Sequence, residues 1–80
     1  MQALETMTKR DLILLNVATN NFRATLEAAR NPDQYSGVSA ATWLRDALEV
    51  LRSAPIFHRC PVAYVEALTN EYQAACVAVL

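Results

Sequence analysis

The chain has 80 residues, enough for one small domain of residues 1–80, and a domain of this size buries only a modest part of its surface on its own. Seven Lys and Arg stand against eight Asp and Glu, a formal net charge of −1. Nucleic-acid binding depends on cationic contacts to phosphates, so we expect no direct binding of DNA or RNA. Apolar residues make up 54% of the chain, above the roughly 45–50% of a typical globular domain. This excess favours self-association or a permanent protein partner.

Cysteine content and hydropathy restrict the chain further. Cys60 and Cys76 are too few for a disulfide framework and lack the further ligands of a zinc site. We therefore interpret both as structural thiols of a reducing compartment. The first residues lack the pattern of a secretory signal, and the uncharged stretch 74–80 is too short to span a bilayer. We expect a cytoplasmic protein, with no metal, no cofactor and no membrane insertion.

The first predicted element is a helix over residues 9–30. Thr8 is a suitable N-cap, and Asp11 stands where an acid can reach back to the cap. Apolar residues recur at three- and four-residue spacing, and a polar stripe has the same period, which is typical of an amphipathic helix. The apolar stripe is Leu15, Ala18, Phe22, Leu26 and Ala29, and the polar one is Asn16, Asn20, Arg23, Glu27 and Arg30. Pro32 favours an end just before it.

The start of this helix is apolar on more than one side. We expect Leu12 and Leu15 to face the core of the same chain. Ile13, Leu14 and Val17 are then left to face another subunit, and we assign them to a dimer interface.

A second helix is predicted over residues 40–53, after a break that contains Pro32 and Gly37. Ser39 is its expected N-cap, and Val38 and Trp43 have the spacing of a hydrophobic staple. The expected buried face is Leu44, Ala47, Leu48 and Leu51.

A third helix is predicted over residues 61–79, with Pro61 as its first residue. Its apolar stripe is Val65, Leu68, Tyr72, Ala75 or Cys76, and Val79. The chain has no charged side chain after Glu71, so we expect a second chain to cover this end and assign Val77 and Leu80 to the dimer interface. Short connections favour antiparallel neighbours. The expected fold is all-α, a helical hairpin or three-helix unit that forms a homodimeric helical bundle.

No catalytic motif is present. His58 and Cys60 have the chemistry of a base and a thiol nucleophile, but residues two apart in a loop rarely converge, and no third group to orient the His is apparent. We interpret Cys60 as a cap of the third helix and His58 as a surface or interface residue. The chain is therefore expected not to be an enzyme.

Large side chains gather near the two breaks. Tyr35, Trp43 and Arg45 are of the three residue types most enriched at interface hot spots, and Phe57 lies in the second break. We select these four as candidate partner-binding residues. The alternatives are a staple for Trp43, a pair with Glu49 for Arg45 and a plug beneath the helices for Phe57.

The segment Thr8 to Arg30, then Tyr35, then Ser39-Ala40-Ala41-Thr42-Trp43-Leu44-Arg45-Asp46-Ala47-Leu48 resembles small phage-encoded anti-activators of bacterial quorum sensing. The resemblance covers most of the first two helices. It implies a dimer that binds a LuxR-type transcription activator and keeps it from DNA. It also implies binding to the type IV pilus assembly ATPase.

Two other classes remain open. Three short helices can form a helix-turn-helix DNA-binding regulator, although the first break is long for that turn and Asp46 and Glu49 stand beside Arg45 and Arg52. A structural or assembly subunit is the other alternative.

Overall fold

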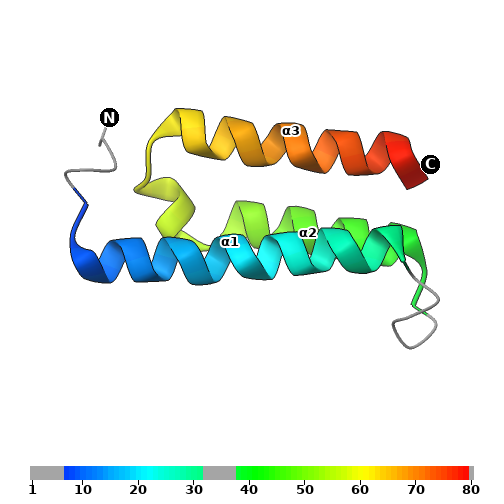
Figure 1. Ribbon diagram of the computed structural model, residues 1–80, viewed down its shortest axis with the longest axis horizontal. Helices are drawn as coiled ribbons and strands as arrows, with labels where there is room; N and C mark the ends of the chain where they lie inside the picture. Colours follow the sequence, from blue (N-terminus) through cyan, green and yellow to red (C-terminus); the bar gives the residue numbers. More distant parts are fainter. Residues whose placement is uncertain (1–6, 32–37, 80) are drawn as a thin grey trace.

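The computed structural model describes residues 7–31 and 38–79, and in these ranges the protein consists of helices and short connections. The helices are α1 (Lys9–Arg30), α2 (Ala40–Ser53), the one-turn 3-10 helix η3 (Pro55–His58) and α3 (Val62–Val79) (Figure 1). The predicted all-α fold is confirmed, and α1 and α2 have the predicted bounds. The third helix begins one residue later than predicted, so Pro61 precedes α3 and is not its first residue.

The two predicted N-caps are present. The Asp11 N–H donates to Thr8 Oγ1 at 3.0 Å, and the Thr42 N–H donates to Ser39 Oγ at 3.3 Å. Each bond satisfies one of the amides that a helix start leaves without an intrahelical acceptor. At the other end of α1, Asn31 Nδ2 donates to the Glu27 carboxylate at 2.8 Å. Local sequence therefore determines where these two helices begin and where α1 ends.

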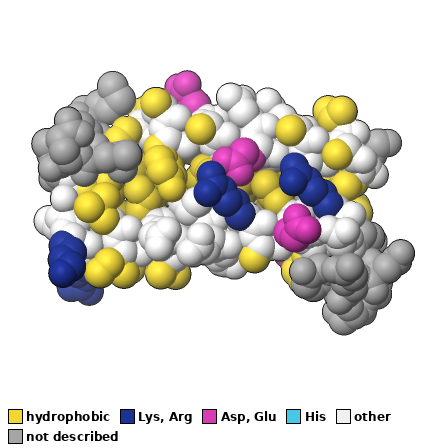
Figure 2. Space-filling model, viewed as in Figure 1, with side chains coloured by type: hydrophobic (Ala, Val, Ile, Leu, Met, Phe, Trp, Pro, Cys, Tyr) yellow, Lys and Arg dark blue, Asp and Glu magenta, His cyan; other side chains and the backbone are white. Residues whose placement is uncertain are grey.

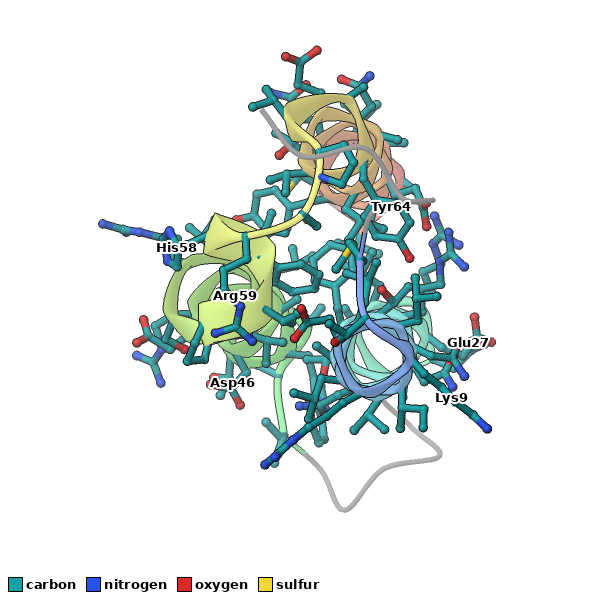
Figure 3. The ribbon with its side chains drawn as sticks, turned by 90° about the vertical axis from the view of Figure 1, so that its left-hand side faces the viewer. Lys9, Glu27, Asp46, His58, Arg59 and Tyr64 are labelled. Carbon is teal, nitrogen blue, oxygen red and sulfur yellow. The ribbon has the colours of Figure 1, made fainter. Side chains whose placement is uncertain are left out.

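The three long helices run alternately up and down, so sequence neighbours are antiparallel (Figure 1). Viewed from the end, they lie at the corners of a triangle, and every pair of them is in contact (Figure 3). The molecule measures 41 × 21 × 16 Å, with α1 along its longest dimension. This arrangement leaves one side of each helix facing outward.

The core fills the space between the helices. Phe22 of α1 and Leu68 of α3 are its largest fully buried side chains. Burial of one such side chain contributes about 1.5–3 kcal/mol. The three alanines Ala29, Ala47 and Ala75 are completely buried, one on each helix, and their small size allows the helices to approach closely. Apart from Leu48, which is half-buried, the apolar stripes predicted for the three helices face this core.

The segment after α2 is more ordered than predicted. Ile56 and Phe57 point from η3 into the core, and Cys60 follows them into it. Phe57 is only 5% exposed, which favours the alternative of a plug beneath the helices over its selection as a partner-binding residue. The reason is that η3 turns its apolar side chains inward across the bundle's end.

Two polar contacts tie α1 to α3. Arg23 Nε and Nη2 donate to the two carboxylate oxygens of Glu71 at 3.0 and 2.8 Å. Thr19 Oγ1 and Tyr64 Oη share a hydrogen bond of 2.8 Å. Figure 2 shows basic and acidic side chains side by side over the apolar band between α1 and α3. The contacts fix α3 against the face of α1 that carries Thr19 and Arg23.

Candidate protein-binding surface

The N-terminal half of α1 exposes large apolar side chains. Ile13 is 55% exposed, Leu14 41% and Val17 61%. Residues three and four apart on a helix are neighbours, so these three form one continuous apolar area. The sequence predicted that they point away from the core, and this is confirmed. What covers them stays a prediction.

Leu12 was expected in the core, and that prediction is wrong. Its side chain is 42% exposed, whereas Leu15 is buried as predicted. The two side chains lie about 60° apart around the helix, and only that of Leu15 is turned far enough inward to be buried. The exposed apolar surface of α1 is therefore larger than expected.

A groove of about 420 Å³ lies between α1 and the junction of α2 with η3. The junction residues have short or rigid side chains, so they leave space in front of α1. The lining is formed by Leu14, Val17, Ala18 and Asn21 of α1, together with Ala54, Pro55, Ile56 and Arg59. The groove is thus mainly apolar and continuous with the exposed area of α1 through Leu14 and Val17.

Arg59 is the charged residue of this lining. Its Nη2 lies 3.4 Å from Asp11 Oδ1, a long contact, and about half of its side chain is exposed. Figure 3 shows the side chain at the end of the bundle, in front of η3. A guanidinium has five N–H donors, and the contact with Asp11 uses one of them. The groove can therefore offer further donors to an acidic group.

The exposed end of α3 carries a second apolar site. Val77 is 83% exposed, while Ala75 on the same turn is completely buried. The described part of the chain thus does not cover Val77. Its assignment to a dimer interface stays a prediction, and Leu80 lies outside the described residues.

Two of the remaining candidate contact residues, Trp43 and Arg45, lie within the described ranges. Trp43 is half-buried and packs against the core, and Arg45 is exposed on α2. Tyr35 lies outside the described residues. Two ion pairs are present within the described ranges, Arg23–Glu71 and Arg59–Asp11, so the alternative pair of Arg45 with Glu49 is not among them.

The thiol and the imidazole near η3 do not converge. Cys60 Sγ donates to the Phe57 carbonyl at 3.7 Å, and burial raises the pKa of its thiol. The thiol contacts the preceding turn, so its interpretation as a cap of the third helix is wrong. His58 Nε2 instead contacts the Arg52 carbonyl at 3.0 Å. A buried neutral thiol with its hydrogen directed at a carbonyl is a poor nucleophile.

Within residues 7–31 and 38–79, no three His, Cys, Asp or Glu side chains are close enough to hold a metal ion. No helix in these ranges combines the length and the hydropathy needed to cross a membrane.

Comparison of the chain with protein-family models, with curated proteins and with solved structures found no match. Sequence reasoning found the exposed residues of α1 but missed the groove and Arg59. A signal in the sequence was Ala54-Pro55, two residues with small side chains directly after the second predicted helix, both of which line the groove.

Proposed function

We propose that this chain is a non-enzymatic inhibitor that binds a bacterial protein in the groove between α1 and the α2–η3 junction. The observation that carries the proposal is the exposure of Leu14 and Val17 beside a groove of about 420 Å³. Exposed apolar side chains next to a concave surface are typical of protein interfaces. The buried, misdirected thiol of Cys60 speaks against the main catalytic alternative.

The groove also indicates the chemistry of its partner. Its floor takes an apolar side chain, and Arg59 at its edge takes a carboxylate. The matching segment therefore presents an apolar anchor with an acidic residue beside it. Such a small number of anchors commonly supplies most of the binding free energy of an interface.

The resemblance to quorum-sensing anti-activators gives the partner a specific form. We propose that it is a LuxR-type transcription activator, which loses its DNA when this chain binds. The exposed face of α2 carries Asp46 and Glu49 as well as Arg45 and Arg52, a charge balance that opposes DNA binding by the chain itself. The type IV pilus assembly ATPase is the second proposed partner.

A gel shift with three components tests this function. It contains the activator, its operator DNA and increasing amounts of the chain. We expect the activator–DNA band to disappear near a stoichiometric amount, and the chain alone to leave the DNA unshifted. A band that persists at excess chain contradicts the inhibitor, and a shift by the chain alone supports the DNA-binding alternative instead.

Two arginine variants locate the binding surface in the same assay. Arg59→Ala removes the cation of the groove. We expect about tenfold more of this variant to be needed to remove the activator–DNA band, in line with loss of a charged hydrogen bond. Arg45→Ala is the matched control, because Arg45 is exposed on α2 and is not part of the groove. An effect of Arg45→Ala without one of Arg59→Ala moves the contact to α2 and contradicts the groove.

A further inference from the structure

The outward side of α1 carries two opposite charges at matched positions. Lys9 and Glu27 are both exposed and lie eighteen residues apart, which is about five turns at 3.6 residues per turn. Their side chains therefore leave the helix in the same direction. Figure 3 shows both on the side of α1 that points away from α2 and α3.

The surface between these charges differs in its two halves. Ile13 and Val17 are large and apolar, and Asn20 and Ala24 are smaller; all four are exposed. The spacing of these four residues, at intervals of four, three and four, keeps them on one side of the helix. We call this row of Lys9, Ile13, Val17, Asn20, Ala24 and Glu27 the α1 seam.

We infer that a second copy of this chain covers the α1 seam, with the two α1 helices antiparallel and the twofold axis near residue 18. In this register Lys9 meets Glu27 of the partner subunit, and Glu27 meets the partner's Lys9. Ile13 meets the partner's Ala24, and Val17 meets the partner's Asn20. Each large side chain faces a smaller one, as close packing of helices requires.

The charges of the seam favour a second copy of the chain as its occupant, and an antiparallel direction of the two α1 helices. A twofold interface uses the same surface on both subunits, so every group must find its complement on an identical copy. The charges of the seam meet this condition, because Lys9 and Glu27 lie at equal distances on either side of its midpoint. A parallel pair brings each Lys9 against the partner's Lys9, which is repulsive.

The seam and the groove are adjacent but distinct. They share Val17, whereas Leu14, Pro55 and Arg59 belong to the groove alone. A dimer through the seam covers Val17 and leaves Leu14, Pro55 and Arg59 of the groove accessible. Each dimer then presents two grooves to the proposed partner.

Charge reversal with sedimentation velocity tests the seam, at low ionic strength and tens of micromolar protein. We expect the wild-type chain to be a dimer, and Lys9→Glu or Glu27→Lys each to weaken dimerisation about tenfold or more. A mixture of the two variants should recover the dimer, because the heterodimer pairs opposite charges at both ends. The double variant carrying both substitutions should recover it as a homodimer. Arg52→Glu, an equal change of charge on the exposed side of α2, should leave the dimer unaffected.

Several results would overturn the seam. One is a wild-type chain that sediments as a monomer. Another is a dimer that all variants retain, because the interface would then lie elsewhere, for example at the end of α3 near Val77. If the wild-type chain is a monomer and its Lys9→Glu variant no longer inhibits the activator, the seam binds the activator and not a second copy of the chain. If the chain is monomeric and still inhibits, the seam fails and the proposed function stands. If the chain is a dimer through the seam but does not inhibit the activator, the seam stands and the proposed function fails. Melting curves for each variant exclude unfolding as the cause, and recovery in the mixture cannot come from unfolded protein.

Discussion

At the scale of single residues, the bidentate contact of Arg23 with Glu71 is an ion pair that joins α1 to α3. The hydrogen bonds from Arg23 hold the pKa of the Glu71 carboxyl below its usual range, and the same contact raises the pKa of Arg23. Both side chains remain more than one third exposed. The contact is therefore screened by water and is worth at most about 1 kcal/mol.

Glu71→Gln should lower the free energy of unfolding by about 0.5–1 kcal/mol at neutral pH. Because the folded-state pKa of Glu71 is lowered, the carboxylate stabilises the fold above its unfolded-state pKa, and this contribution is lost as the pH falls through the folded-state value. Urea unfolding curves of the wild-type chain and of the Glu71→Gln variant, at neutral and at strongly acidic pH, measure the difference in the free energy of unfolding. The difference between them should vanish in acid, and a constant difference would show that the charge of Glu71 is not its cause. Glu66→Gln on the exposed face of α3 is the matched control.

At the scale of elements, η3 stabilises the end of the bundle. Its two buried side chains, Ile56 and Phe57, close the core where α2 ends and α3 begins. The Phe57 N–H donates to the Ala54 carbonyl and the Cys60 N–H to the Ile56 carbonyl, each at 3.1 Å. These bonds hold the turn in the conformation that directs Phe57 inward.

Phe57→Ala should therefore act on stability. Removal of a buried aromatic ring costs about 3–5 kcal/mol, a large part of the stability of a small domain. Thermal and urea unfolding should show this loss, while Arg52→Ala on the nearby exposed surface should change stability by less than about 0.5 kcal/mol. A stable Phe57→Ala variant that fails to inhibit the activator would show instead that Phe57 contacts the partner.

The helices were predictable because their signals are local. Thr8 and Ser39 cap helices by bonding amides three residues away, and the stripe from Leu15 to Ala29 has the helical period. The turn at η3 was missed because its conformation depends on burial of Ile56 and Phe57 against distant residues. The groove was missed for the same reason, since it exists only where α1 passes the α2–η3 junction. Leu12 was misplaced because periodicity gives the direction of a side chain but not the position of the neighbouring helices.

At the scale of the whole molecule, the apolar excess of the sequence has two destinations. One part fills the core around Phe22 and Leu68, and the other stays on the surface at Ile13, Leu14, Val17 and Val77. A chain of 80 residues has too little interior to bury all of it. The proposed self-association through the α1 seam and the proposed partner binding in the groove would cover Ile13, Leu14 and Val17 of this surface part.

Isothermal titration calorimetry, in which the chain is titrated into a purified LuxR-type activator, is the most direct test of groove binding. We expect saturable binding by the wild-type chain. Leu14→Glu, which places a charge in the groove, should weaken it by about thirtyfold or more, the effect of losing an interface anchor worth roughly 2 kcal/mol. Val77→Glu places the same charge on an exposed valine of α3 and should bind as the wild-type chain does. Failure of the wild-type chain to bind, or equal affinity of the folded Leu14→Glu variant, would contradict the account.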